Sequence, residues 1–588
     1  MNIFGVHVKM RRTLILVLTI ANLLLFVIFI SRRLGFGSNK PHSASLRNQV
    51  SSDAYGELVD GKKDKYRSHK RFDRCPNYLS YSQKPHGPFT NGRYKYPYMR
   101  PPLKCRTFTS QAVERLIEDL KSKVEDEDLA RLIENCLPNT LDTTILWYDP
   151  AHTAGKTKEP RTFVVTGDIH AEWLRDSARQ LSMYQPLIKY DKGLRDLLRG
   201  AINLQTYYIN TSPYCNAFHP PPGSGVSKGD AHVDNVFPKP QWQQVFECKY
   251  ELDSLASFLT LTNEYYQNSG DLSFVTPSWL QAYQLLLIVL ARESAPTFNE
   301  KTGYADSFYY SFRRNTDLGS ETLPLSGVGN PVNYGTGLVR SAFRPSDDAC
   351  IFQFFIPANA YLLVELKKTS EILDRVLKLN PESPVKHLLD ITLNFIQKIE
   401  KGIEKYGIVE HPVWGKVYAF EVDGYGGAAL MDDANIPSLL SLPDLGFVDK
   451  NDDVYKNTRK MILSKSGNPY YINGPYFEGI GGPHIGIVNA WPMSLLMKIR
   501  TSDNDDEIKA DLRYVMKTTA NLGLMHESVN VHSENGKLYT RPWFAWCNSE
   551  FGKTILYLAK YKPHLIFKQE YKSIPYNLDH VLSSRSVN

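Results

Sequence analysis

Residues 166–180, TGDIHAEWLRDSARQ, gather side chains that could bind or transform a polar substrate. The stretch contains carboxylates, an imidazole, an indole and a guanidinium, namely Asp168, His170, Glu172, Trp173, Arg175 and Asp176. Acids near the start of a helix that follows Gly167 are well placed to accept hydrogen bonds from the hydroxyl groups of a polyol. The alternative is an ordinary helix with a capping acid and a surface ion pair between Arg175 and Asp176.

Six further segments combine acids, aromatic residues and glycine in varying proportion. They are HVDN (232–235), YELDS (250–254), FRPSDDA (343–349), MDDAN (431–435), GIGGPHIG (479–486) with AWP (490–492), and MHES (525–528) with TRPWFAW (540–546). Sugar rings present apolar C–H faces and hydroxyl rims, so indoles and carboxylates together suit a carbohydrate ligand. The composition of these segments therefore favours a carbohydrate site.

Motifs for several other chemistries are incomplete. His526-Glu527 begins like the zinc-binding HExxH motif, but the next histidine is His532, six residues from His526. Residues 424–427, GYGG, lack the full dinucleotide fingerprint, and no GxxxxGK[ST] sequence occurs. Acid/base catalysis by a pair of carboxyl groups is thus the leading interpretation. Glycoside hydrolysis needs one protonated carboxyl group and one ionised carboxylate.

The segments, in this order, resemble glycoside hydrolase family 125, the exo-acting α-1,6-mannosidases. The resemblance covers about residues 161–556 and rests on TGDIHAEWLRDSARQ, YELDSL, FRPSDDA, MDDANIPSLL, GIGGPHIG with AWPMSL, and MHES with TRPWFAW. It implies an (α/α)6 barrel that removes terminal non-reducing α-1,6-linked mannose with inversion and needs no metal or other cofactor. Carried over to this chain, the general acid is Asp347 or Asp348 and the general base is Glu527.

The remaining polar and aromatic residues of the segments are candidates for binding the sugar. The predicted substrate-binding residues are Asp168, His170, Trp173, Arg175, Asp176, Asp253, Asp432, Asp433, Asn435, His484, Trp491, Arg541 and Trp543. The histidines could equally be satisfied loop residues, and any one of the indoles could equally belong to the core. Ser346 is expected to cap a helix whose first turn carries both Asp347 and Asp348, where one ionised acid would raise the pKa of the other.

The elements that must position these segments are mostly helical. Helical periodicity predicts a helix opened by Ser110, one near 129–133 and others at 194–208, 254–266, 279–292, 356–368, 371–379, 385–403, 428–440, 454–464, 493–499, 508–521 and 551–561. Convincing strand alternation is rare. The pattern predicts one all-α domain, and an (α/α)6 toroid would use this number of helices.

The N-terminal region predicts a membrane address. Residues 13–30, TLILVLTIANLLLFVIFI, are uncharged, and about 27 Å of helix would match a bilayer core. We expect a single-pass type II protein with a cytosolic tail (1–12), a signal-anchor (13–30), a disordered stem (31–72), a lumenal hydrolase domain (73–575) and a C-terminal tail (576–588). The sequon at Asn210 weakly supports a lumenal body in the endoplasmic reticulum or Golgi.

Composition narrows the remaining possibilities. The net charge of +7 is small for 588 residues and does not suggest nucleic-acid binding. The seven cysteines contain no CxxC spacing for zinc; Cys75 with Cys105 is the first candidate for a disulfide, and the odd count leaves at least one thiol unpaired. The leading prediction is a membrane-anchored inverting α-mannosidase acting on mannose-containing glycans. The alternatives are another glycosidase or transferase on the same toroid, or a non-catalytic glycan-binding protein.

Overall fold

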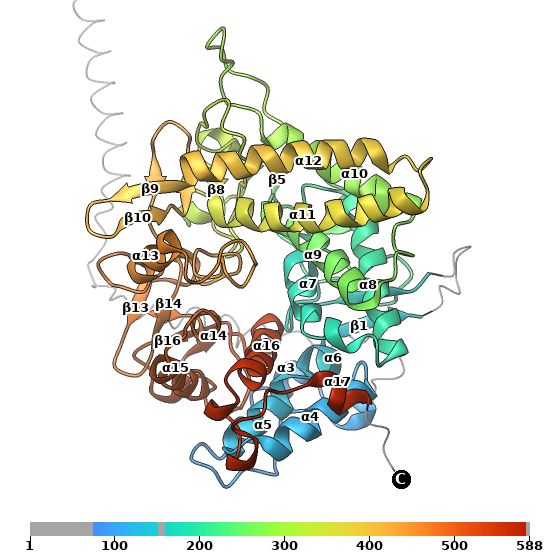
Figure 1. Cartoon of the computed structure of the whole chain (residues 1–588), viewed down its shortest axis with the longest axis vertical. Coiled ribbons are helices and arrows are strands. Elements are labelled where there is room, and N and C mark those ends of the chain that lie inside the picture. Colours follow the sequence, from blue (N-terminus) through green and yellow to red (C-terminus); the bar gives the residue numbers. More distant parts are fainter. Residues whose placement is uncertain (1–74, 151–158, 584–588) are drawn as a thin grey trace, which may run out of the picture. The chain divides into compact units, whose positions relative to one another are not determined.

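The computed structural model describes residues 75–150 and 159–583 (Figure 1). The chain divides into units 1–66 and 67–588, and the described residues belong to the second unit. The predicted anchor at 13–30 and the predicted stem at 31–72 lie outside the described residues. Of the helices within the described ranges, none combines the length and apolar character needed to cross a membrane.

Helices dominate the described part of the chain, as the periodicity predicted. They are α3 (Tyr78–Tyr81), α4 (Gln111–Lys123), α5 (Glu127–Cys136), α6 (Asn139–Thr143), α7 (Leu174–Ser182), α8 (Lys192–Thr211), α9 (Leu252–Ser269), α10 (Pro277–Glu293), α11 (Ile356–Leu379), α12 (Val385–Gly402), α13 (Asp453–Ile462), α14 (Pro492–Arg500), α15 (Asp505–Lys517), α16 (Ala545–Tyr561) and α17 (Leu578–Ser583). Ser110 caps α4 as expected, because its hydroxyl accepts a hydrogen bond from the N–H of Val113. The two helices predicted at 356–368 and 371–379 are one continuous helix, α11.

The helices are arranged in a ring (Figure 1). Helices α7 and α14 are buried along their whole length and belong to its inner layer, together with α9, α11 and α16. Each inner helix packs on a neighbour, since α7 contacts α9 and α16, α9 contacts α11, and α14 contacts α16. Helices such as α12 and α15 bury one face only and form the outer layer. This two-layer ring is the architecture expected of the toroid.

One inner position is filled by turns instead of the helix predicted at 428–440. Residues 428 and 429 form the short strand β12, and bends and turns follow up to Gly446. The carboxylate of Asp432 accepts hydrogen bonds from the N–H groups of Leu439 at 2.8 Å and Leu440 at 3.0 Å. Pro437 has no N–H for a helical ladder. The apolar spacing in this segment therefore reflects a buried turn and not a helix.

The strands are short, and several of them stand immediately before inner helices. They are β1 (Ile145–Asp149), β2 (Arg161–Val164), β3 (Glu172–Trp173), β4 (Ala217–Phe218), β5 (Asn235–Phe237), β6 (Val245–Glu247), β7 (Ser311–Arg313), β8 (Phe354–Phe355), β9 (Ile408–His411), β10 (Gly415–Tyr418), β11 (Glu421–Val422), β12 (Ala428–Ala429), β13 (Tyr471–Asn473), β14 (Glu478–Ile480), β15 (Asn489–Ala490), β16 (Ser528–Asn530) and β17 (Tyr539–Thr540). The ladders are antiparallel, for example β3-β4-β6 and β15-β16-β17. These small sheets fix the loops that enter α7, α9 and α14.

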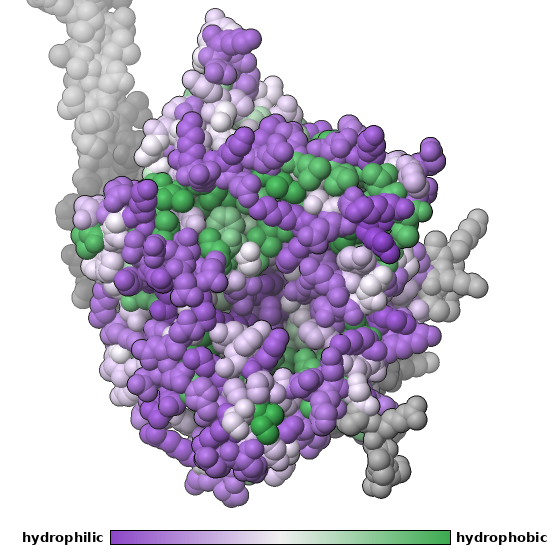
Figure 2. Space-filling view, viewed as in Figure 1, coloured by the Kyte–Doolittle hydropathy of each residue, from purple (hydrophilic) through white to green (hydrophobic). Residues whose placement is uncertain are grey.

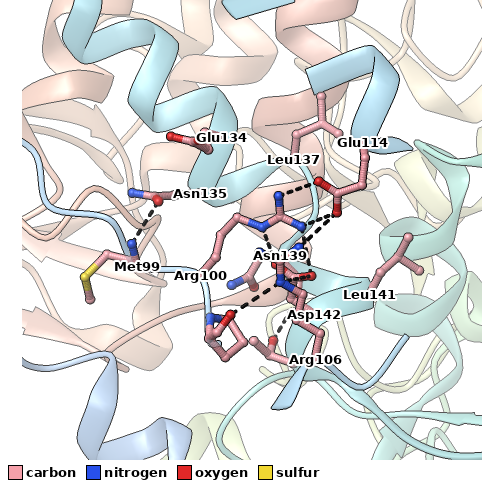
Figure 3. Close-up of polar contacts among 12 residues, drawn as sticks. Met99, Arg100, Arg106, Glu114, Glu134, Asn135, Leu137, Asn139, Leu141 and Asp142 are labelled. Atoms are coloured by element: carbon pink, nitrogen blue, oxygen red, sulfur yellow. Dashed lines mark hydrogen bonds and ion pairs between the residues drawn. The ribbon is translucent and has the colours of Figure 1, made fainter. Parts of the chain in front are cut away.

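The segment before α4 is held on the ring by buried charges (Figure 3). Arg100 is 4% exposed; its Nε donates to Asp142 at 2.7 Å and its Nη1 to Glu114 at 2.8 Å. Arg106 joins the same two carboxylates. A buried guanidinium needs such partners, because an uncompensated buried charge is strongly destabilising. The irregular, Tyr- and Pro-rich segment is thus an integral part of the domain.

Helix α17 lies beyond the boundary predicted at 575 and packs on α4. The domain bounds stay a prediction. Figure 2 shows a mainly hydrophilic face, with a band of apolar residues over α11 and α12. Asn210 lies in the last turn of α8, where its side chain donates hydrogen bonds to Ser278 at 3.0 and 3.1 Å. Its glycosylation stays a prediction.

The predicted disulfide between Cys75 and Cys105 is confirmed. A second disulfide joins Cys215 to Cys248, and within the described ranges three cysteines remain reduced and buried, namely Cys136, Cys350 and Cys547. The second disulfide links the loop after α8 to the segment that leads into α9. That segment borders the candidate site.

Candidate active site

A pocket lies where the inner helices begin. Its walls contain the start of α7 and the residues that precede or open α14 and α16; the lining residues are Thr166, Trp173, Arg175, Asp176, Pro345, Ser346, Asp347, Asn435, His484, Trp491, Glu527, Arg541, Phe544 and Trp546. It holds about 350 Å³ of space between atoms, part of it open to solvent. Helix N-termini carry partial positive charge and favour carboxylates. Segments far apart in the sequence thus meet at one polar pocket.

The two candidate acids differ in their position relative to the pocket. Asp347 lines it with a side chain that is 28% exposed, whereas Asp348 is fully buried. Oδ2 of Asp348 accepts hydrogen bonds from the Ser346 hydroxyl at 3.2 Å and from the N–H of His484 at 3.0 Å. Asp348 therefore ties the loop of His484 to its own turn, and Asp347 presents its carboxyl group to the pocket.

The helix predicted to start at Ser346 is absent, and the aspartates sit in a tight turn. Asp347 has a φ of +68°, a left-handed conformation that is uncommon outside glycine. The Nζ of Lys249 donates a hydrogen bond to the main-chain oxygen of Asp347 at 2.9 Å and helps to hold that conformation. Ser346 caps no helix because the chain turns directly back to Asp348, whose carbonyl accepts the N–H of Arg344 at 2.8 Å.

Arg175 is a buried guanidinium surrounded by carboxyl groups. Its Nη1 donates to Glu251 at 2.6 Å and to Asp253 at 3.2 Å, and its Nη2 lies 3.4 Å from Asp176 and 3.9 Å from Asp347. The ion pair with Asp176 that was the alternative to sugar binding is therefore present, in a buried setting. Trp546 lies under the guanidinium, with its ring centroid 5.4 Å away.

The negative charges of Asp347 and Glu527 both act on the carboxyl group of Asp176. Its side chain lines the pocket, and Oδ2 has no hydrogen-bond donor among the described residues. Burial raises the pKa of Asp176 to about 6, with Arg175 acting against the shift and Asp347 adding to it. An acceptor with spare capacity in a pocket is suited to bind a hydroxyl group of a ligand.

Glu527, the residue directly before β16, lines the pocket. Its Oε2 accepts a hydrogen bond from the Thr540 hydroxyl at 2.8 Å, and its Oε1 lies 3.5 Å from Nε of Arg541. Nε of Arg541 is also 3.7 Å from Asp168, whose pKa is raised by burial. Arg541 has a φ of +57°. One side chain oxygen of Glu527 is thus anchored, while the residue as a whole faces the pocket.

The predicted indoles separate into two groups. Trp173 and Trp491 line the pocket, as does Trp546, which the sequence did not single out. Trp543 instead packs with Met99 and Leu524 and lies against Gly167. Gly167 has a φ of +139°, and a Cβ there would come within 3.2 Å of the Trp543 carbonyl oxygen, so only glycine lets the chain pass.

Other predicted ligands also lie behind the lining residues. Asp253 and Asp432 are fully buried and bind Arg175 and the 438–440 turn respectively, and the carboxylate of Asp433 accepts hydrogen bonds from Asn435. His170 is half-buried outside the pocket lining, and its pKa is lowered by burial. Lys249 and Glu251 contact the site and were not predicted. Their signal was the YELDS segment, in which Glu251 stands beside the predicted Asp253.

A buried ion network lies next to the pocket. One turn beyond Arg175 on α7, the buried Arg179 pairs at 2.7 Å with Glu550, which also pairs at 2.6 Å with Arg500. Glu550 accepts a hydrogen bond from the indole N–H of Trp546 at 3.2 Å, so the network contacts a residue that lines the pocket.

A ring of paired helices with a polar pocket that holds three acid side chains from separate segments, Asp176, Asp347 and Glu527, is the arrangement expected of a glycoside hydrolase of the toroid class. The chain belongs to glycoside hydrolase family 125, described as metal-independent alpha-mannosidases, which it matches over residues 126–556.

Two relatives show how far the likeness extends. The chain is 53% identical over 495 residues to the Meiotically up-regulated gene 157 protein of Schizosaccharomyces pombe, covering 84% of this chain and 94% of that protein. A solved Streptococcus pneumoniae member of the metal-independent alpha mannosidases, in a non-productive complex with alpha-1,6-mannobiose, is 31% identical with a TM-score of 0.67; the match covers 77% of this chain and 99% of that one.

Proposed function

We propose that this chain removes terminal, non-reducing α-1,6-linked mannose from glycans with inversion of configuration. The observation that carries the proposal is that Asp347 and Glu527, supplied by segments 180 residues apart in sequence, line one pocket. The relative solved with alpha-1,6-mannobiose supports the linkage. The buried ion network that contacts the lining residue Trp546 supports exo action, because side chains on that side of the pocket would obstruct a polymer that continued past it.

In this proposal Asp347 is the general acid and Glu527 the general base. Asp347 protonates the glycosidic oxygen as the bond from C1 to that oxygen breaks, and Glu527 takes a proton from the water that attacks C1. Asp348 is left out of the acid role because its buried carboxyl group holds the loop of His484. The anchored Thr540 hydroxyl and Arg541 orient Glu527 toward the water.

The pocket lining supplies the terminal mannose subsite. Oδ2 of Asp176, which is ion-paired with Arg175 but accepts no hydrogen bond from the described residues, accepts hydroxyl groups of the sugar. Trp173 and Trp491 offer apolar surfaces, and the further lining residues predicted to bind the sugar are Arg175, Asn435, His484 and Arg541. Asp168, Asp253 and Asp433 act indirectly, by holding the lining residues in place.

The reaction can be read in one experiment on the soluble body of the protein. Incubation with α-1,6-, α-1,2- and α-1,3-linked mannobiosides in EDTA, followed by proton NMR from the first minutes, is expected to show mannose from the α-1,6 compound only. The first sugar released should be β-mannose, because one displacement inverts C1. Initial α-mannose would refute inversion, and release from another linkage with none from α-1,6 would refute the assigned specificity.

We further propose that residues 13–30 anchor the protein in a membrane of the secretory pathway, with the hydrolase domain in the lumen. The uncharged apolar stretch supports the anchor, and the two disulfides support an oxidising compartment. The full-length chain is expected to stay in the membrane pellet after alkaline carbonate extraction and to resist protease in intact microsomes. A chain that starts at residue 73 should be extracted; extraction of both would refute the anchor.

A further inference from the structure

The carboxyl groups of Asp347 and Glu251, the residue at the N-cap position of α9, interact with each other beside the guanidinium of Arg175, which lies 2.6 Å from Glu251 and 3.9 Å from Asp347. A carboxylate offers only acceptor atoms, so two carboxyl groups form a hydrogen bond only when one of them carries a proton. Oδ1 of Asp347 has no nitrogen or hydroxyl donor in the described part of the chain. The pair is therefore built to hold a proton between its two carboxyl groups.

The charges around Arg175 point to the same conclusion. Four carboxyl groups surround its guanidinium: Glu251 at 2.6 Å, Asp253 at 3.2 Å, Asp176 at 3.4 Å and Asp347 at 3.9 Å. Lys249 is the second buried cation, since it is 1% exposed and bound to the Asp347 carbonyl. Two cations do not neutralise four carboxylates away from water, where desolvation disfavours every unpaired charge. The excess of carboxyl groups over directly bound cations therefore favours a protonated carboxyl group in this cluster.

The two members of the pair differ in where the proton rests. Burial raises the pKa of Glu251 well above its usual range, although Arg175 opposes the shift. Burial also acts to raise the pKa of Asp347, but Lys249, Arg175 and His484 outweigh it and lower that pKa to about 2. These two directions favour the proton on Glu251, while a general acid at Asp347 must carry it when the glycosidic bond breaks.

We propose that Glu251 and Asp347 form a proton-sharing pair, in which Glu251 stores the proton that Asp347 delivers to the glycosidic oxygen. This inference rests on the proposed function, in which Asp347 is the general acid. Glu251 does not line the pocket and acts only through Asp347, so it is a positioning residue.

The proton balance of the step is closed. The proton moves from the carboxyl group of Glu251 to Asp347, and from Asp347 to the leaving oxygen, which takes the electron pair of its bond to C1. The attacking water forms the new bond to C1 and gives its proton to Glu527. Both members of the pair are then ionised beside Arg175 and Lys249. The pair regains one proton from solvent as Glu527 loses one, which restores the starting state.

The fold fixes Glu251 for this task. Its Oε1 accepts a hydrogen bond from the Asn216 amide at 3.1 Å, and its Oε2 accepts from the Ser254 hydroxyl at 2.8 Å and from Arg175. The disulfide at Cys215 and Cys248 braces both neighbouring segments. The charged or titratable groups that face the pair are Arg175 and Asp176 on α7, Lys249 and Asp253 around the start of α9, Tyr310 before β7, and His484.

The test is the pH dependence of Glu251→Gln, measured as kcat/KM on an α-1,6-mannobioside and on 2,4-dinitrophenyl α-mannoside. Glu251 becomes an anion when its proton moves to Asp347, and that negative charge keeps Asp347 protonated. The amide can neither supply the proton nor become an anion, so Asp347 loses its proton at lower pH. For the mannobioside, we expect the high-pH limb of the kcat/KM profile to move to lower pH by on the order of one unit. At pH values above the limbs of both proteins, the variant should then have about tenfold lower kcat/KM than the wild type. The dinitrophenyl leaving group needs no proton, so its hydrolysis should change less than about threefold.

Asp253→Asn is the matched control, because it removes a carboxylate from the same guanidinium without changing Glu251 or Asp347. Asp253→Asn should lower kcat/KM for both substrates in equal proportion. It should move the high-pH limb less than Glu251→Gln does. If Glu251→Gln fails to fold, Glu251→Asp withdraws the carboxyl group by one methylene and should move the limb in the same direction. An unmoved limb, or equal loss on both substrates, would overturn the pair.

The outcomes also separate this inference from the proposed function. No hydrolysis of the mannobioside by the wild-type protein would overturn the function itself. A wild-type protein that is active and an Asp347→Asn variant that fails only on the mannobioside, together with an unmoved limb in Glu251→Gln, would overturn the proton-sharing pair alone.

Discussion

Glu527→Gln should bind a mannobioside as well as the wild-type protein does and turn it over about 10²- to 10⁴-fold more slowly, the range that a positioned general base contributes. The amide keeps the shape of the side chain and can still contact Thr540 and Arg541, which lie 2.8 and 3.5 Å from the carboxylate. It cannot accept the proton of the attacking water. Single-turnover rates and equilibrium binding, measured on the same preparation, check the two halves of this expectation.

If Glu527 is the general base, the loss of turnover in Glu527→Gln should not depend on the leaving group. Turnover of 2,4-dinitrophenyl α-mannoside should fall as far as turnover of the mannobioside, because water must be activated for both. Near-normal turnover in Glu527→Gln would remove the residue from the base role. Asp168→Asn is a useful comparison, since Asp168 touches Arg541 from the other side and should reduce activity only by disturbing that arginine.

Asp347→Asn should have the second largest effect, and the effect should depend on the leaving group. Loss of the general acid should slow the mannobioside by about 10²- to 10⁴-fold, whereas an aryl mannoside that leaves as a stable phenolate should be much less affected. Asparagine at 347 tolerates the left-handed φ of +68° better than most residues do, so the turn should survive. Steady-state rates on a series of aryl mannosides of different acidity measure this dependence.

The neighbouring Asp348→Asn supplies the matched control. Asp348 is buried and accepts hydrogen bonds from Ser346 and His484. Its substitution should therefore lower Tm and reduce the rates of mannobioside and aryl mannoside hydrolysis by the same factor. Selective loss on the mannobioside in Asp348→Asn, with none in Asp347→Asn, would exchange the roles of the two aspartates.

The sequence by itself determined the local elements and the inventory of the site. Helical periodicity predicted most helices, and Ser110 predicted the start of α4. Both signals are readable from the sequence because capping and amphipathic spacing depend on neighbouring residues. The order of the acid- and aromatic-rich segments predicted family 125, which the match over residues 126–556 confirms. The disulfide between Cys75 and Cys105 was also predicted, and it is present.

Only the tertiary structure decided which of these residues face one another. Asp347 lines the pocket and Asp348 does not, because Asp347 lies in a turn with φ of +68°; adjacent acids look alike in a sequence. Glu251 and Arg175 meet although 76 residues separate them. Trp546 lines the pocket, whereas Trp543 packs against Gly167. Trp543 precedes the N-cap residue Phe544 and Trp546 lies in the first turn of α16, so the two indoles point in different directions. The segment at 428–440 had helical spacing, but side-chain capping by Asp432 made it a turn. Such outcomes depend on burial and long-range contacts, which spacing along the chain does not encode.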